Sequence, residues 1–133
     1  IMTSLEIVQN YYHAFNSGNW NEMLTFVDDQ ILHEPNESEP RIGKELFVEF
    51  LKKMDACYEE QLTNVVFYTS SDESRIASEF TVNGIYKKGE AGLPEAKGQS
   101  YLLPAGAFLE VKNGKITRVT TYYNLELWIS LVS

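Results

Sequence analysis

Up to about residue 58, apolar residues recur every three or four positions, the spacing that places side chains on one face of a helix. The first helix is predicted over residues 4–17. Thr3 and Glu6 form a capping-box pattern before it, and Gly18 is a natural end. The residues that share its apolar face are Leu5, Val8, Tyr11, Tyr12 and Phe15.

Two more helices are predicted in this part of the chain. Asn19 and Glu22 make a second capping-box pattern, which opens a short helix. A short strand is expected over residues 30–34, and a loop over residues 35–43, which are rich in Pro, Asn, Ser and Gly. The helix predicted over residues 44–58 has an apolar stripe made of Leu46, Phe47, Phe50, Leu51, Met54, Cys57 and Tyr58.

After residue 60 the apolar period changes to two, which is typical of strands. Four long strands are predicted, over residues 63–70, 75–87, 99–111 and 115–124. Asn113-Gly114 joins the last two and is typical of a tight hairpin turn. Residues 125–132 are predicted to form a short helix or a docked strand. Residues 88–98 form a long, polar, glycine-rich connection, which is either a lid over a site or a solvated hairpin tip.

Helices followed by an antiparallel meander predict an α+β fold, with the helices packed on one face of a curved sheet. The space between the two layers is then a cone-shaped cavity. The length of 133 residues predicts one domain, residues 1–133. No signal-peptide pattern and no apolar run near 18 residues is found, so we expect a soluble, cytoplasmic protein.

The net charge of −8 argues against nucleic acid and against an anionic membrane as partners, because the eleven basic residues are scattered. Eight tyrosines favour a pocket that is apolar along its walls and polar at a few points, so the expected partner is a small hydrophobic molecule. The single cysteine, Cys57, excludes an internal disulfide and is expected to be a buried structural thiol.

Two segments resemble a known family. Residues 9–18 and 26–35, continuing into the Ser-Glu-Pro-Arg-Ile-Gly run of residues 38–43, resemble the ketosteroid-isomerase branch of the NTF2-like superfamily, also called cystatin-like or SnoaL-like. Residues 103–108 and 120–124 look like the isomerase-related proteins of that branch, which generally lack an established substrate. The resemblance implies the NTF2-like cone, and an enzyme that needs no cofactor.

The resemblance also implies roles for single residues. Glu34, at the end of the short strand and before Pro35, falls where the isomerases place the carboxylate that moves the substrate proton. Tyr11 falls where they place the tyrosine that donates a hydrogen bond to the developing oxyanion. If Glu34 and Tyr11 share one apolar cavity, they form a base and an electrophile. The second oxyanion donor, a protonated aspartic acid in the isomerases, is replaced by Gly106.

The alternation of strands extends this site to a candidate ligand pocket. If Gly106 faces inward, so do its alternate neighbours in the same strand. Gly84 and Gly106 then leave room for a flat ligand, or they mark bends of the sheet. The expected pocket residues are Phe15, Phe80, Val82, Gly84, Tyr86, Leu102, Pro104, Gly106, Phe108, Val119, Thr121 and Tyr123.

Other chemistry receives little support. His33 and Glu34 are neighbours in a strand and should face opposite ways, so a dyad between them is not expected. His13 and His33 have no Cys or Asp spacing pattern of a metal site. The outward face of the last long strand, with Arg118, Thr120 and Tyr122, is expected to form a homodimer contact.

Three functions remain open. The first is a steroid-isomerase-like enzyme that abstracts a proton alpha to a carbonyl, with Glu34 as base and Tyr11 as donor. Aldol closure of the polyketide-cyclase type needs the same base and a similar cavity. The third is a ligand-binding protein without catalysis, which the glycine at position 106 favours.

Overall fold

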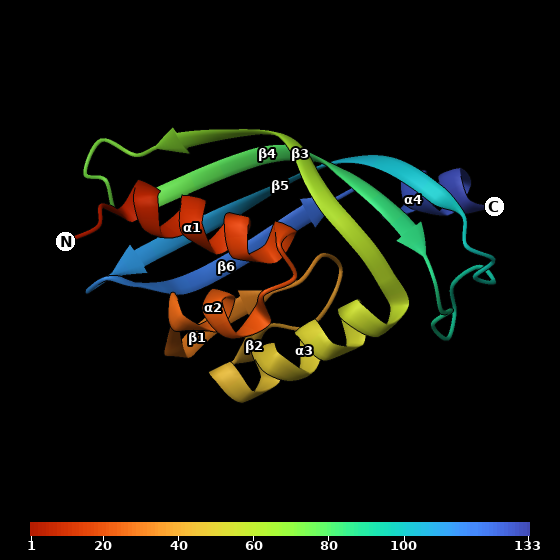
Figure 1. Ribbon diagram of the computed structural model, residues 1–133, viewed down its shortest axis with the longest axis horizontal. Coiled ribbons are helices and arrows are strands. Elements are labelled where there is room, and N and C mark those ends of the chain that lie inside the picture. The colour runs from red at the N-terminus through yellow and green to blue at the C-terminus, as the bar shows by residue number, and fades with distance from the viewer.

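The computed structural model describes residues 1–133. It confirms the α+β class: helices pack on one curved, mostly antiparallel sheet (Figure 1). The elements in chain order are α1 (Ser4–Asn16), α2 (Trp20–Thr25), β1 (Val27–Glu34), β2 (Arg41–Ile42), α3 (Lys44–Cys57), β3 (Tyr58–Thr69), β4 (Arg75–Tyr86), β5 (Ser100–Lys112), β6 (Lys115–Tyr123) and α4 (Leu125–Val132).

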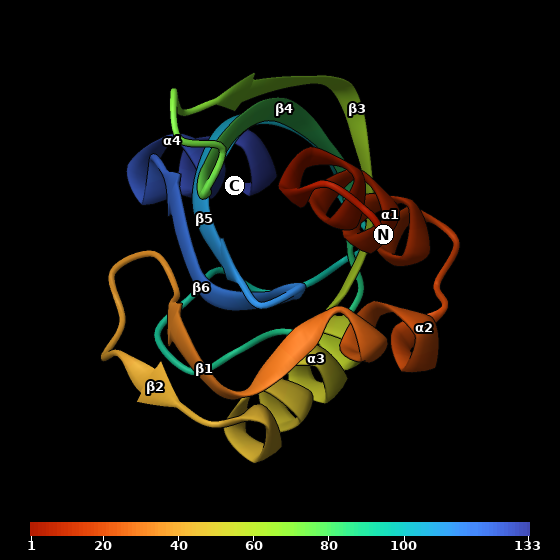
Figure 2. The ribbon, with the colours of Figure 1, turned by 90° about the vertical axis from the view of Figure 1, so that its left-hand side faces the viewer.

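The sheet has the strand order β2-β1-β6-β5-β4-β3. Strands β3 to β6 form the expected antiparallel meander, and β1 joins it by pairing in parallel with β6. Viewed end-on, the sheet curves without closing, and α1 lies on its concave side (Figure 2). No helix is long and apolar enough to cross a membrane.

The local signals for helix ends act as predicted. The Thr3 hydroxyl accepts from the Glu6 amide at 3.1 Å, and the Glu6 carboxylate accepts from the Thr3 amide at 2.9 Å, which completes the capping box of α1. The Asn19 side chain accepts from the Glu22 amide in the same way at the start of α2. Each cap satisfies amide groups that the first turn leaves free.

Some boundaries differ from the prediction. Strand β3 begins at Tyr58, directly after α3, and not near residue 63. Its first residues alternate a polar outward position with an inward one, so Glu59 and Gln61 hide the strand pattern in the sequence. The predicted loop over residues 35–43 contains the short strand β2, which pairs with the end of β1.

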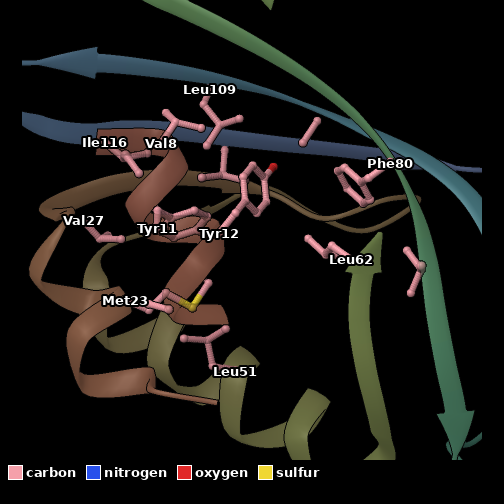
Figure 3. Close-up of a cluster of buried hydrophobic side chains, with 14 of the residues drawn as sticks. Val8, Tyr11, Tyr12, Met23, Val27, Leu51, Leu62, Phe80, Leu109 and Ile116 are labelled. Atoms are coloured by element: carbon pink, nitrogen blue, oxygen red, sulfur yellow. The ribbon is translucent and has the colours of Figure 1, made fainter. Parts of the chain in front are cut away.

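The core lies between α1 and the concave face of the sheet (Figure 3). Val8 is fully buried, and the ring of Tyr12 packs against Phe67 and Phe80, with centroids 5.8 Å from each. The Tyr12 hydroxyl is 2.8 Å from Ser78 Oγ, so its buried oxygen is paired. Cys57 is a free, buried thiol, as expected.

Strand β5 faces the opposite way from the prediction. Tyr101, Leu103 and Ala107 are buried on the concave side, whereas Leu102 and Phe108 are 61% and 48% exposed on the other. Gly106 pairs with Tyr122, an outward residue of β6, and Ala105 pairs with the inward Tyr123. Both faces of this strand are apolar in sequence, so alternation alone does not determine which face is buried.

Candidate functional site

A cavity of about 550 Å³ lies between the concave face of the sheet and the helices. This volume is within the range of small-molecule sites. Its apolar wall is mainly aromatic and aliphatic, and includes Phe15, Trp20, Met23, Phe47, Phe50, Leu51, Leu62, Phe80, Val82, Leu103 and Val119. A few polar groups interrupt this wall, and they are the candidates for chemistry.

The predicted site residues divide into two sets. Those that line the cavity are Tyr11, Phe15, Phe80, Val82, Val119, Thr121 and Tyr123. Those that do not are Glu34, Gly84, Tyr86, Leu102, Pro104, Gly106 and Phe108. Four of these residues lie on the outward face of β5, which the prediction had placed inward: Leu102, Pro104, Gly106 and Phe108. Gly84 and Tyr86 do face inward, but other side chains cover them.

Glu34 lies on the outer side of the sheet, away from the cavity. Its carboxylate accepts a hydrogen bond of 2.6 Å from the Thr120 hydroxyl and lies 3.4 Å from the Arg118 guanidinium. Glu34 is paired with Thr120 in the β1–β6 ladder, whereas His33 is paired with the inward Val119. The structure therefore does not bring Glu34 and Tyr11 into one cavity, and His33 is the residue of this segment that lines it.

A different carboxylate, Glu60 of β3, lines the cavity. Its Oε2 atom accepts a hydrogen bond of 2.6 Å from the Tyr101 hydroxyl. Glu60, Gly84 and Tyr101 are in register across β3, β4 and β5. A Cβ atom on Gly84 would collide with the ring of Tyr101, so the absence of a side chain at Gly84 lets the tyrosine ring reach across β4 to the carboxylate.

Desolvation makes Glu60 a stronger base than an exposed carboxylate. Burial raises the pKa of Glu60, and the hydrogen bond from Tyr101, which lowers it, compensates only partly. Burial also raises the pKa of Tyr101, as do the charge and the hydrogen bond of Glu60, so the phenol keeps its proton. Glu60 Oε1 accepts no hydrogen bond from the chain and is free to take a proton.

Two tyrosine hydroxyls are candidate donors to a ligand oxygen. Burial raises the pKa of Tyr11 well above its usual range, and the neighbouring Tyr12 adds to this effect. The Tyr11 hydroxyl makes no hydrogen bond within the chain, although its ring is 96% buried beside Tyr12. Burial, together with the charges of Glu60 and Glu90, also raises the pKa of Tyr123. Both phenols therefore remain protonated donors at neutral pH.

His33 is a neutral group in the cavity wall. Burial, and next the charge of Arg41, lowers its pKa to about 4. Its ring makes edge-to-face contacts with Phe47 and Phe50, with centroids 5.0 and 4.6 Å away. Its Nδ1 atom is buried without a hydrogen-bond partner. With so low a pKa, His33 is a weak base and is better suited to hydrogen bonding than to proton abstraction.

The connection of residues 88–98 brings another carboxylate to the cavity, which Asp55 and Glu59 also line. Glu90 accepts a hydrogen bond of 2.6 Å from the Tyr58 hydroxyl and pairs with Lys53 of α3 at 2.7 Å. Leu93 from the same connection also lines the cavity. Burial raises the pKa of Glu90, but the contacts with Lys53 and Tyr58 outweigh it and the pKa is lowered. Glu90 is thus held as an ion, and this connection covers one end of the cavity.

Sequence reasoning missed the charged and titratable residues of the cavity wall: His33, Arg41, Lys53, Asp55, Glu59, Glu60 and Glu90. The alternation of Tyr58, Glu60 and Leu62 could have revealed Glu60, had β3 been started at residue 58. No local pattern indicates Glu90. No group of three or more His, Cys, Asp or Glu side chains is placed to hold a metal ion.

The comparisons with known proteins identify the family of the chain. Residues 8–119 match the family described as SnoaL-like domain. A solved structure from Pseudomonas putida KT2440, named as a “putative polyketide cyclase”, is 45% identical, with full coverage of both chains and a TM-score of 0.97. One from Xanthomonas campestris pv. campestris with the same name is 44% identical over 98% of this chain and 96% of that one, with a TM-score of 0.94.

A more distant structure shows the fold alone. It is an NTF2-like protein of unknown function from Burkholderia pseudomallei K96243, 15% identical, which aligns with a TM-score of 0.82 over 100% of this chain and 99% of its own. No protein of curated function matches. The predicted NTF2-like superfamily is confirmed, and the chain belongs to the family of SnoaL-like domains.

Proposed function

We propose that this protein abstracts a proton alpha to a carbonyl of a small hydrophobic ligand and so promotes an intramolecular aldol closure of the polyketide-cyclase type. The observation that carries the proposal is Glu60. It is a desolvated carboxylate with a raised pKa and one free oxygen, and it lies in the wall of an apolar cavity. A base of this kind is suited to proton transfer near neutral pH.

The chemistry needs only side chains of this cavity. Glu60 takes the proton from the carbon next to the ligand carbonyl, and the electron pair of that C–H bond forms an enolate. The enolate carbon attacks a second carbonyl of the same ligand, forming a C–C bond and an alkoxide. Glu60, now protonated, returns the proton to the alkoxide oxygen, and the carboxylate is regenerated.

Tyr11 is the proposed donor to the enolate oxygen. Its hydroxyl has no partner in the chain and keeps its proton, so it can donate a hydrogen bond that strengthens as negative charge develops. Tyr123, from β6, also lines the cavity and is a second candidate. We expect Tyr11→Phe to slow proton abstraction about 10²- to 10³-fold, the usual effect of removing one oxyanion donor.

The names of the two close relatives support ring closure as the overall reaction. Steroid-type isomerisation shares the first step and differs in where the proton returns. The inward residues of β5 near the cavity, Leu103 and Ala105, carry no hydrogen-bond donor in their side chains. The second oxyanion donor of the isomerases therefore has no counterpart on β5. Gly106 lies on the outward face of this strand, so a side chain at that position would not enter the cavity either.

Proton abstraction can be measured without knowing the natural substrate. We expect the protein to accelerate deuterium exchange at the alpha carbons of 2-tetralone, a flat hydrophobic ketone, when followed by NMR in D2O. Glu60→Gln should reduce the rate about 10²- to 10⁴-fold, the usual contribution of a general base. The matched control is Glu34→Gln, which removes a carboxylate on the outer face and should leave the rate within about twofold.

Two outcomes would contradict the proposal. If Glu34→Gln abolishes exchange and Glu60→Gln does not, the base is the residue implied by the family resemblance, and the cavity carboxylate is structural. If the wild-type protein binds 2-tetralone but does not exchange its protons faster than buffer, the protein is a binding protein. Closure of heptane-2,6-dione to 3-methylcyclohex-2-enone with loss of water, followed by enone absorbance, then distinguishes the aldol reaction from proton exchange alone.

A further inference from the structure

The three arginines of the chain differ in their partners. Arg75 and Arg118 both pair with Glu110 on the outer face of the sheet, at 3.4 and 3.0 Å. Arg41 forms no ion pair. It is also the only arginine in the wall of the cavity. Arg41 is therefore the one arginine that lines the candidate ligand site and has no carboxylate partner.

The position of Arg41 is set by the sheet and by α3. It lies directly opposite His33 in the β1–β2 ladder, on the same face. Its guanidinium carbon is 5.4 Å from the ring centroid of Phe50, a cation–π distance. The guanidinium thus lies over the Phe50 ring, and none of its N–H groups donates to an acceptor of the chain, so they are free for a planar acceptor.

The residues of the cavity wall that are nearest to Arg41 in the sequence carry hydrogen-bond donors and no charge. Asn36 and Ser38 line the cavity beside Arg41, and the Nδ2 atom of Asn36 is buried without an acceptor. None of the carboxylates that line the cavity forms an ion pair with Arg41; they are Asp55, Glu59, Glu60 and Glu90. Glu60 accepts a hydrogen bond from Tyr101, and Glu90 pairs with Lys53 and accepts from Tyr58. Arg41 is therefore the cation of this wall that no carboxylate of the chain compensates.

We propose that Arg41 is the subsite for an anionic oxygen of the ligand, so that the natural ligand is a hydrophobic carbonyl compound that also bears a carboxylate or an ionised enol or phenol. A carboxylate can accept two parallel hydrogen bonds from a guanidinium edge. The anionic group anchors the ligand at the β1–β2 end, and its carbonyl chain extends along the apolar wall.

The overall charge of the protein makes this proposal specific. A net charge of −8, and four carboxylates in the cavity wall, oppose the binding of any anion. Without an anion subsite, a neutral ester should bind more tightly than the matching carboxylate. A preference for the carboxylate would thus require a local cation, and Arg41 is the unpaired one in this wall.

The test compares two probes that differ only in charge, 2-naphthoate and methyl 2-naphthoate, by titration calorimetry at low salt. We expect the wild-type protein to bind 2-naphthoate more tightly than its ester. Arg41→Gln should weaken naphthoate binding tenfold or more and change ester binding less than twofold, because a charge-assisted contact is lost. The naphthoate affinity of Arg41→Lys should lie between those of the wild-type protein and Arg41→Gln, since lysine keeps the charge but lacks the planar pair of donors of a guanidinium.

Arg75→Gln is the control variant, because it removes an arginine from the outer face. Equal binding of the two probes by the wild-type protein, unchanged naphthoate affinity in Arg41→Gln, or no binding of either probe would overturn the proposal. Melting curves of each variant identify any loss that comes from unfolding.

A second measurement locates the anion. His33 lies opposite Arg41, and His13 lies on the exposed side of α1. Naphthoate should shift the ring signals of His33 and not those of His13, and the shift should disappear in Arg41→Gln. Shifts that persist in the variant would place the anion elsewhere.

This inference uses the cavity proposed above as the ligand site, but it rests on equilibrium binding and not on turnover. Loss of exchange in Glu60→Gln with intact naphthoate binding supports both proposals. Naphthoate binding by a protein that exchanges no protons supports the anion subsite and contradicts the catalytic function.

Discussion

Gly84 shows how one missing side chain determines the chemistry of the cavity. Its backbone does not adopt a left-handed conformation, so the position does not need glycine for torsional reasons. What it needs is space, because the ring of Tyr101 lies where a Cβ would be. The space that the sequence suggested for a ligand at Gly84 is therefore occupied by the ring of Tyr101, the residue that donates to Glu60.

Gly84→Ala should destabilise the fold by about 1–3 kcal/mol, because the Tyr101 ring must move from a packed position. Displacing Tyr101 also removes the hydrogen bond that lowers the pKa of Glu60, so that pKa should rise further. Urea denaturation measures the first effect. In a Tyr101→Ala background the same substitution should cost much less, and an equal cost in both backgrounds would rule out the clash as its cause.

His33 should make the fold sensitive to acid. Its pKa is about 4 in the folded protein and about 6.5 in the unfolded chain, so between these values only the unfolded state binds the proton. The free energy of unfolding should therefore fall by about 1.5 kcal/mol from pH 6.5 to pH 5 on account of this group. Glu60, with a raised pKa, acts in the opposite direction.

The measurement is denaturant unfolding at several pH values. His33→Gln should remove this part of the pH dependence, whereas His13→Gln, on the exposed side of α1, should retain it. The same slope in wild type and His33→Gln would show that other groups cause any acid sensitivity.

Among the elements, the connection of residues 88–98 has the clearest link to the cavity. It is joined to α3 and β3 through Glu90, and to β4 through Tyr86, whose hydroxyl donates to the Pro94 carbonyl at 2.7 Å. Backbone hydrogen bonds anchor its two ends, from Lys88 to Cys57 and from Gly98 to Tyr86. The side-chain contacts of Glu90 and Tyr86 add local stability between these ends. Of the two predicted alternatives, a lid or a solvated hairpin tip, the structure favours a role at the cavity, because Glu90 and Leu93 form part of its wall.

Glu90→Ala should increase amide hydrogen exchange within residues 88–98 and leave the β4 and β5 amides protected, because the contacts with Lys53 and Tyr58 are lost. Glu95→Ala is the matched control, since the Glu95 side chain is exposed and in no ion pair. Equal exchange in the two variants would show that Glu90 does not fasten the connection.

At the scale of the whole molecule, the convex face of the sheet exposes several aromatic side chains. Tyr68, Phe108 and Tyr122 are 54%, 48% and 57% exposed there, and the rings of Phe108 and Tyr122 are in edge-to-face contact at 5.9 Å. An exposed aromatic cluster of this kind is typical of an interaction surface. The homodimer expected from the sequence stays our proposal for this face.

We expect sedimentation analysis to show a dimer that Phe108→Asp and Tyr122→Asp convert to a monomer, because each places an unpaired charge in the apolar contact. Leu46→Asp, on the exposed side of α3, should leave the dimer intact. A monomeric wild-type protein at all concentrations would contradict the proposal.

Much of the fold could be predicted because its signals are local. The capping boxes, the helical spacing in α1 and the hairpin at Asn113-Gly114 depend on residues close in sequence. The opposite facing of His33 and Glu34 was also predictable. Which of the two side chains faces the cavity was not predictable, because this follows from the parallel pairing of β1 with β6, about 86 positions away in the sequence.

The sequence by itself determined the α+β class, the helix ends, the apolar cavity and six of its predicted wall residues besides Tyr11. Only the tertiary structure decided which carboxylates line the cavity and which face of β5 is buried toward it. The physical reason is that alternation defines two faces of a strand, whereas burial of one of them depends on register with distant strands. Glu34 therefore remains outside, and Glu60, held across Gly84 by Tyr101, takes its place as the candidate base.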